Sequence, residues 1–166
     1  QKNMGPAGTT LVIVKDNILG RTGRKIPTML DYTTHINKDS MFNTPPVFSI
    51  YVSMLTLKWL KGKGGVEYIE QINNQKAQKL YQEIDRNVLF KGLVKDKDRS
   101  NMNVTFKLNN KELESVFDSL CKTVGINGLK GHRSVGGYRA SLYNALPLKS
   151  VEVLVKTMQN LEKNNK

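Results

Sequence analysis

Apolar side chains recur at the spacing of an amphipathic helix in three stretches of the chain. Residues three and four positions apart lie on one face of a helix, so each stretch predicts a helix with one buried face. Asn109, followed by Glu112 three residues later, resembles a capping box and predicts where the second helix begins. The three stripes are Val66, Ile69, Ile72, Ala77, Leu80 and Ile84; Leu113, Val116, Phe117, Leu120, Cys121 and Val124; and Leu148, Val151, Leu154, Val155, Met158 and Leu161.

Other apolar stretches lack this one-sided pattern. Residues 45–65 are apolar around most of the helix circumference, start with two prolines and end in GKGG, which predicts a largely buried helix. The run TTLVIVK (9–15) is β-branched and does not alternate, which predicts a strand buried on both faces. NVTFKL (103–108) predicts a second strand, residues 91–101 predict a charged loop, and the Gly-rich residues 125–145 are expected to include short strands.

The order of these elements divides the chain in two. From about residue 100 it runs strand, helix, strands, helix, which predicts a compact α/β unit. The first 62 residues contain one strand that needs neighbours on both sides, and they supply none. We therefore expect residues 1–62 to be the end of a larger domain. A glycine-rich hinge then leads into a small α/β domain, residues 63–166.

Composition narrows the possible functions without selecting one. The net charge is +12, but the excess is spread over both parts of the chain. A basic module that binds nucleic acid therefore stays open, beside a generally basic surface or a site for anions. No apolar run is long enough to span a membrane, and no secretory leader is visible. Cys121 is the only cysteine, which suits a reducing, cytoplasmic location, and two well-separated histidines do not predict a metal site.

The segment QKNMGPAG (1–8) is the first of three stretches that are rich in chemistry. Lys2 stands directly before a Gly/Pro turn and the apolar run, a position in which it could be held rigidly beside a pocket. A lysine amine is suited to Schiff-base chemistry when burial or a nearby cation favours its neutral form. The alternative is a surface lysine at a disordered terminus.

The segment SMFNTPP (40–46) is the second stretch. Asn43 and Thr44 stand just before a predicted helix start, where side-chain donors and free backbone N–H groups can bind an anion such as phosphate. Asn and Thr are also the residues that commonly cap helices, so an ordinary N-cap is the alternative.

The segment KGHRSVGGYRAS (130–141) is the third stretch. Arg133 and Arg139 are six residues apart, and a guanidinium group binds carboxylate or phosphate, often through two hydrogen bonds. Gly136 and Gly137 between them allow a positive φ or a close approach to a ligand. Together with His132, this pattern indicates a site for an anionic substrate, and the alternative is a basic surface loop.

With MLDY (29–32), KWL (58–60) and GLKGHRSVGGYRASLYNALPL (128–148), these stretches resemble the phosphoserine aminotransferase family. Its members are pyridoxal 5'-phosphate (PLP) enzymes of the class V aminotransferase group. The resemblance covers essentially all 166 residues, and the last motif is highly specific. It implies an α/β chain of fold type I, in which residues 1–62 end the large PLP-binding domain and residues 63–166 form the small C-terminal domain. The N-terminal half would be missing or would be a separate chain, so we expect this chain alone to be inactive.

The resemblance also implies which residues bind the cofactor. Lys2 matches the lysine that bonds covalently to PLP and acts as the catalytic base, and Gln1 matches its neighbour near the PLP phosphate. Asn43 and Thr44 match a pair that reaches the PLP phosphate of the other subunit of a homodimer.

The substrate residues are implied in the same way. Arg139 matches the arginine that binds the α-carboxylate, whereas His132 and Arg133 match residues that bind the substrate phosphate from the neighbouring subunit. The implied reaction converts 3-phosphohydroxypyruvate and glutamate into phosphoserine and 2-oxoglutarate in serine biosynthesis. A class V aminotransferase with another substrate is the nearest alternative.

Overall fold

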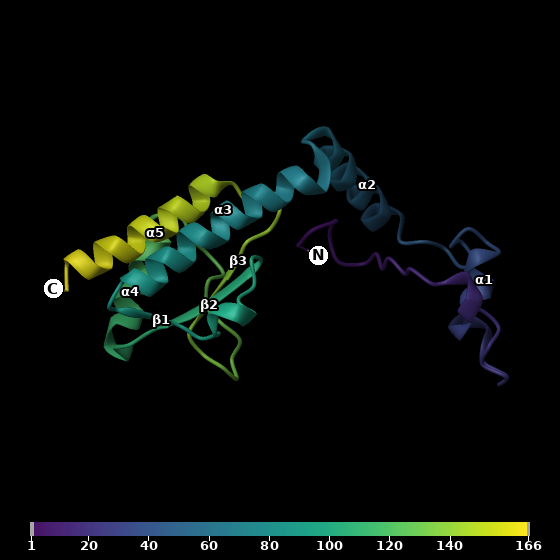
Figure 1. Cartoon of the computed structure of the whole chain (residues 1–166), viewed down its shortest axis with the longest axis horizontal. Coiled ribbons are helices and arrows are strands. Elements are labelled where there is room, and N and C mark those ends of the chain that lie inside the picture. Colours follow the sequence, from purple (N-terminus) through teal and green to yellow (C-terminus); the bar gives the residue numbers. More distant parts are fainter. Residues whose placement is uncertain (1, 166) are drawn as a thin grey trace. The chain divides into compact units, whose positions relative to one another are not determined.

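The three helices expected from one-sided apolar stripes are present in the computed structural model, which describes residues 2–165 (Figure 1). Leu80, Phe117 and Met158, one from each stripe, are completely buried, because all three stripes face the same core. The helices are α3 (Gly65–Arg86), α4 (Glu114–Thr123) and α5 (Leu148–Lys163).

The start of α4 differs by one residue from the prediction. The side chain of Asn110, not of Asn109, accepts a hydrogen bond from the Glu112 N–H at 3.0 Å and begins the 3-10 turn Lys111–Leu113 that leads into α4. Asn109 instead donates its side-chain amide to the Val88 carbonyl at 2.8 Å. Both asparagines can cap a helix, and only the tertiary contact of the first one decides between them.

The predicted strand at residues 103–108 is confirmed as the centre of an antiparallel sheet. The three strands β1 (Phe90–Gly92), β2 (Asn103–Leu108) and β3 (Tyr138–Ser141) lie in the order β1-β2-β3. β1 was not predicted from the sequence, because three residues are too few to show alternation. A further 3-10 turn, Asp96–Asp98, lies in the charged loop between β1 and β2.

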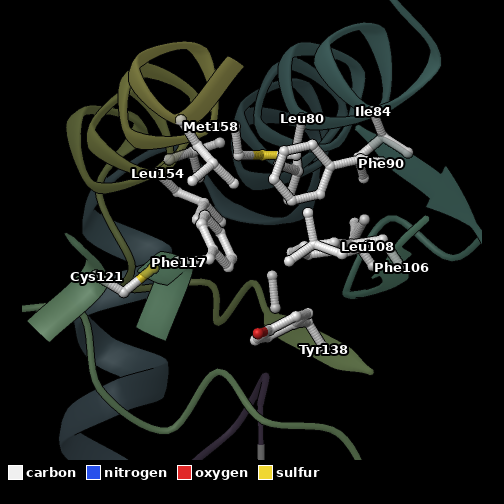
Figure 2. Close-up of a cluster of buried hydrophobic side chains, with 14 of the residues drawn as sticks. Leu80, Ile84, Phe90, Phe106, Leu108, Phe117, Cys121, Tyr138, Leu154 and Met158 are labelled. Carbon is white, nitrogen blue, oxygen red and sulfur yellow. The ribbon is translucent and has the colours of Figure 1, made fainter. Parts of the chain in front are cut away.

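The core lies between one face of this sheet and the helices, and α3 and α5 run side by side there (Figure 1). Figure 2 shows Phe90, Phe106, Phe117 and Tyr138 pointing toward one another beneath the helix side chains. The ring of Phe117 meets those of Phe90 and Tyr138 edge-on, with centroids 5.2 and 5.1 Å apart. These edge-to-face contacts fix the position of β3, because Tyr138 is its first residue.

Glu83 is the centre of a polar contact between α3 and α5. Its carboxylate is buried and accepts hydrogen bonds from Arg86 at 2.7 Å, Asn87 at 2.8 Å and Gln159 at 3.0 Å. Arg86 also donates to Glu162 on α5 at 2.9 Å. Burial alone raises the pKa of Glu83, but the hydrogen bonds outweigh burial and leave the pKa below its ordinary value. The buried charge is therefore well compensated.

Acid should weaken this contact. Because the pKa of Glu83 is lower in the folded than in the unfolded chain, its stabilisation is present above about pH 4.5 and is lost as the pH falls toward the folded value. We expect Glu83→Gln to lower the free energy of unfolding by about 2 kcal/mol at neutral pH and to flatten its decline in acid. Urea unfolding followed by circular dichroism at several pH values measures both effects.

Glu70→Gln is the matched control, because Glu70 is an exposed residue of the same helix. Its substitution should change the free energy of unfolding by less than about 0.5 kcal/mol. If the free energy of unfolding falls equally steeply in acid with Glu83 and with Gln at that position, Glu83 is not the source of the acid sensitivity.

The N-terminal part of the chain forms a separate compact unit, residues 3–59, whereas Lys2 belongs to the C-terminal unit with the residues from Leu60 onward. The boundary falls within α2 (Val47–Gly62), close to the expected one at residue 62. The assignment of residues 1–62 and 63–166 to two domains of a larger enzyme stays a prediction. The N-terminal unit also contains α1 (Tyr32–Ile36) and 3-10 turns at Asp16–Ile18 and Thr28–Leu30.

The strand expected at residues 9–15 is absent, and that prediction is wrong. The segment has no regular secondary structure, and Ile13 is 89% exposed. A strand needs neighbours that satisfy its backbone N–H and C=O groups, and residues 3–59 form no other strand. The apolar run therefore remains an extended, solvent-exposed segment.

The helix expected at residues 45–65 is confirmed, but its expected burial is wrong. α2 starts directly after the two prolines, and none of its side chains is buried. Phe48 is 78% exposed and Tyr51 is 55% exposed. Residues 5–8 lie against the side of the helix that bears Ser49 and Ser53, but most of its large apolar side chains remain exposed.

Candidate active site

Lys2 is held by the turn that follows β3. Its backbone carbonyl accepts a hydrogen bond from the Asn144 N–H at 3.2 Å, and its Nζ lies 5.5 Å from the centroid of the Tyr143 ring. The residue is half-buried, and its amine forms no ion pair with any carboxylate of the part of the chain that the structure describes. Lys2 is thus a held residue with an available amine. Gln1, its predicted companion at the cofactor phosphate, lies outside the described residues.

Two side chains of α3 hold the turn that contacts Lys2, and the sequence interpretation missed both. Lys76 Nζ donates to the carbonyls of Tyr143 and Leu146, at 2.8 and 3.2 Å. Asn73 donates its amide to the Asn144 side-chain oxygen at 2.9 Å. One signal was available, since Lys76 stands on the apolar stripe of the helix, where a lysine is out of place.

Arg139 lies on the open face of the sheet. It is the second residue of β3, and its neighbours Tyr138 and Ala140 point into the core, so alternation along the strand turns Arg139 outward. Its backbone N–H donates to the Leu129 carbonyl at 2.7 Å, and it stands opposite Thr105 of β2. No described carboxylate pairs with the guanidinium group, so it remains available to an anion.

The strand start that positions Arg139 is anchored to α4. The Tyr138 hydroxyl donates to Asp118 Oδ1 at 3.1 Å, and Lys130 pairs with the other oxygen of Asp118 at 2.8 Å. Burial, reinforced by the bond to Asp118, raises the pKa of Tyr138 well above its ordinary value, so the phenol stays protonated and keeps donating. The backbone of Arg139 is therefore fixed between two anchored elements.

The open face of the sheet is basic beyond Arg139. Lys91 of β1 and Lys107 of β2 stand directly opposite each other, and both are exposed. Like charges in directly opposite positions repel, which disfavours the pairing unless an anion is close. The electrostatic field on this face thus favours an anionic ligand over a cationic one.

His132 and Arg133 lie in a tight loop that precedes β3. The Gly131 N–H donates to the Gly137 carbonyl at 2.8 Å and closes the loop. His132 Nδ1 contacts Ser134, at 2.8 Å from its hydroxyl oxygen and 3.3 Å from its backbone nitrogen, so Nε2 is the ring nitrogen that remains for a ligand. Both side chains are exposed, as an anion-binding loop requires.

The loop and Lys2 lie at opposite ends of β3. The loop leads into Tyr138, and the turn that holds Lys2 begins after Ser141. A strand rises about 3.3 Å per residue, so the strand alone separates the two places by on the order of 10 Å. Arg139 lies within the strand, between them. The structure therefore brings Arg139 closer to Lys2 along β3 than it brings His132 or Arg133.

Asn43 and Thr44 belong to the N-terminal unit, and both are exposed. Neither stands at the N-cap position, because Pro46 directly precedes the first residue of α2. The two prolines have no N–H group, so fewer backbone donors are available here than a helix start usually offers. Asn43 donates a weak hydrogen bond to the Met29 sulfur at 3.3 Å. The ordinary-cap interpretation is thus not supported, and Asn43 and Thr44 contribute two side-chain donors close to this helix start.

The described residues contain little that suits other chemistry. Among residues 2–165, no group of three or more His, Cys, Asp or Glu side chains could hold a metal ion. Burial, with a smaller effect of Asp118, raises the pKa of Cys121 to about 11, so this thiol is a poor nucleophile. No described helix has both the length and the apolar character needed to cross a membrane.

Comparison with known proteins identifies the family. The profile of the family described as aminotransferase class-V matches residues 1–154, so this chain belongs to the class V aminotransferases. A phosphoserine aminotransferase of Flavobacterium psychrophilum is 67% identical over 162 residues, which cover 98% of this chain and 46% of that protein. The chain thus spans about half the length of the curated relatives it matches. The family match favours an enzyme over the alternative of a basic nucleic-acid-binding module.

Solved structures agree with this family. Phosphoserine aminotransferase from Bacillus circulans subsp. alkalophilus superposes with a TM-score of 0.93 at 43% identity, over 99% of this chain and 46% of that one. A PLP-bound phosphoserine aminotransferase from Trichomonas vaginalis superposes with a TM-score of 0.75 at 37% identity, over 81% of this chain and 39% of that one. The expected fold class, an α/β chain of the fold type I aminotransferases, is confirmed.

The loop before Arg139 depends on Gly137. This residue has a φ of +63°, and a Cβ there would lie 2.7 Å from the Phe106 carbonyl oxygen, which is backbone and cannot move away. We expect Gly137→Ala to lower the free energy of unfolding by about 2–3 kcal/mol, as measured by thermal unfolding. Gly136→Ala is the control, because its φ is +74° but no atom lies within 4 Å of the added methyl group. It should cost only about 1 kcal/mol, and equal effects of the two substitutions would contradict this account.

Proposed function

We propose that this chain forms the C-terminal half of a PLP-dependent phosphoserine aminotransferase. The reaction converts 3-phosphohydroxypyruvate and glutamate into phosphoserine and 2-oxoglutarate, a step of serine biosynthesis in the cytoplasm. The observation that carries the proposal is the position of Lys2, whose backbone is held by the turn directly following the strand that bears Arg139 and whose amine lies beside the Tyr143 ring. An amine and an anion-binding group are thus carried by one compact unit.

The residues present suit PLP. Lys2 has an amine without an ion-pair partner among the described residues, which leaves it free to bond to the cofactor aldehyde. Asn43 and Thr44 would offer an exposed amide and hydroxyl to the cofactor phosphate of the other subunit of a homodimer, whereas Gln1 would lie near the cofactor phosphate beside its own Lys2. When bound, PLP supplies an electron sink for the charge that develops at the substrate Cα.

Arg139 and Lys2 divide the work on the substrate. The Arg139 guanidinium group would bind the α-carboxylate through two hydrogen bonds and so fix the direction of the Cα–H bond. Lys2 Nζ, once free, would take the proton from Cα and return it at the cofactor C4′ position. The protonated Tyr138 keeps the strand under Arg139 in place during these steps.

His132 and Arg133 would act on the substrate phosphate in the active site of a neighbouring subunit. Their loop lies at the end of β3 remote from Lys2, which supports a homodimer in which each subunit completes the other site. A phosphorylated substrate is favoured by a loop that presents an imidazole and a guanidinium group together.

Covalent trapping tests the role of Lys2. In the full-length enzyme, with the preceding half supplied, PLP followed by borohydride should label Lys2, as located by peptide mass spectrometry. Lys2→Ala should lose the label and lower turnover by roughly 10²- to 10⁴-fold, because the proton-transfer group is gone. Lys15→Ala, an exposed lysine of the same segment, should keep both. Label on another lysine of the wild-type enzyme would refute the proposal.

Substrate preference separates the proposed enzyme from other class V aminotransferases. Turnover of phosphoserine should greatly exceed that of serine or alanine. Arg133→Ala should reduce this preference by roughly 10- to 100-fold, because a charge-assisted bond to the phosphate is lost. Arg139→Ala should lower kcat/KM for all of these substrates to a similar extent, because each has an α-carboxylate. Comparable wild-type rates on serine and phosphoserine would favour the alternative substrate class.

A further inference from the structure

Lys76 is a buried cation in the apolar stripe of α3. Its side chain is completely buried, and no carboxylate of residues 2–165 forms an ion pair with it. Burial lowers the pKa of the ammonium group, which is the expected effect of removing a cation from water. A methionine would fill the same space without this cost, so packing alone does not explain a lysine here.

The ammonium group of Lys76 closes a turn. It donates to the carbonyl of Tyr143 at 2.8 Å and to that of Leu146 at 3.2 Å, the first and last residues of the turn 143–146. The Leu146 N–H also donates to the Tyr143 carbonyl at 2.9 Å. Asn73, three residues earlier on the same helix face, donates to the Asn144 side chain at 2.9 Å. The turn is thus fastened to a helix of the core at both ends and in the middle.

The same turn makes the contacts that hold Lys2. The Asn144 N–H binds the Lys2 carbonyl at 3.2 Å, and the Tyr143 ring lies 5.5 Å from the Lys2 amine, within the range of a cation–π contact. Lys2 belongs to the C-terminal unit, whereas Asn3 and the residues after it, up to Trp59, belong to the N-terminal unit. The path from Lys76 to Lys2 therefore has one intermediate, the turn 143–146.

We propose that Lys76 is a positioning residue for Lys2, which acts by fixing the turn 143–146, and that the Tyr143 ring is the surface against which the Lys2 amine rests. The proposal rests on the proposed function of Lys2 as the PLP lysine. Loss of either contact should leave the fold intact but release the amine, so that it meets the substrate Cα less often in the correct geometry.

Two pairs of variants of the full-length enzyme test this. Lys76→Met removes the ammonium group at nearly constant volume, and Lys79→Met is its control, since Lys79 is an accessible lysine of the same helix that pairs with Glu152 at 3.0 Å. Tyr143→Leu removes the ring, and Tyr143→Phe keeps it. Tyr143 is 38% exposed, so neither of its substitutions should disturb folding.

The first measurement is made without the cofactor. The apoenzyme is treated with trinitrobenzenesulfonate, and the labelling rate of the Lys2 peptide is followed by mass spectrometry. We expect Lys76→Met to raise this rate several-fold, because the turn 143–146 no longer holds the Lys2 amine beside the Tyr143 ring. Tyr143→Leu should raise it roughly two- to fivefold, because the ring that lies beside the amine is gone. Lys79→Met and Tyr143→Phe should match the wild type.

The second measurement is the kinetics of the loaded enzyme. Lys76→Met and Tyr143→Leu should lower kcat by roughly 10- to 100-fold with little change in KM, because the amine is misplaced while Arg139 still binds the substrate. Wild-type values of labelling and kcat in a folded Lys76→Met variant would overturn the role of Lys76. If that variant does not fold, equal behaviour of Tyr143→Leu and Tyr143→Phe overturns the proposal.

The proposed function can fail separately. If PLP and borohydride do not label Lys2 in the wild-type enzyme, the proposed function is wrong. The trinitrobenzenesulfonate labelling rates then still show whether the turn 143–146 holds the Lys2 amine in place. If Lys2 is labelled in the wild type, but both variant pairs label and turn over alike, the function stands and the positioning role is wrong.

Discussion

The pairing of β3 with β2 is the constraint on which the candidate site depends. It buries Tyr138 and Ala140, and alternation then places Arg139 on the open face of the sheet. It also fixes where the loop with His132 and Arg133 ends and where the turn that holds Lys2 begins. A shift of one residue in this register would turn Arg139 into the core and expose Tyr138. The aromatic contacts of Tyr138 in Figure 2 therefore stabilise the core and also keep Arg139 on the open face of the sheet.

Helix α3 carries two buried charges that are compensated in different ways. Glu83 is surrounded by an arginine and two amides, which tie α3 to α5. Lys76 has only backbone carbonyls, which tie α3 to the turn after β3. Both charges cost solvation energy, which hydrogen bonds offset. Both partners of Lys76 are far away in sequence, whereas Glu83 has two nearby partners, Arg86 and Asn87, and one distant partner, Gln159. Helix α3 thus supports both the packing of the core and the turn that contacts Lys2.

Periodicity predicted the C-terminal unit better than the N-terminal one. α3, α4, α5 and β2 lie where the apolar pattern places them, because their partners are in the same chain. The strand at residues 9–15 and the burial of α2 were predicted wrongly. An apolar pattern shows that a segment has side chains to bury, but it does not show whether another part of this chain packs against them. β1 escaped prediction, since three residues are too few to show alternation.

Residue type and spacing alone indicated which residues carry chemistry: an amine at Lys2, donors at Asn43 and Thr44, an imidazole at His132 and guanidinium groups at Arg133 and Arg139, in an order that matches one family. Their chemistry follows from residue type and spacing, which are local properties. Three features follow only from the fold: Lys2 joins the C-terminal unit, Tyr143 faces its amine, and the buried Lys76 holds the turn that contacts Lys2. These contacts join residues about 70 and 140 positions apart, and no local pattern specifies such pairs because they arise from packing in three dimensions.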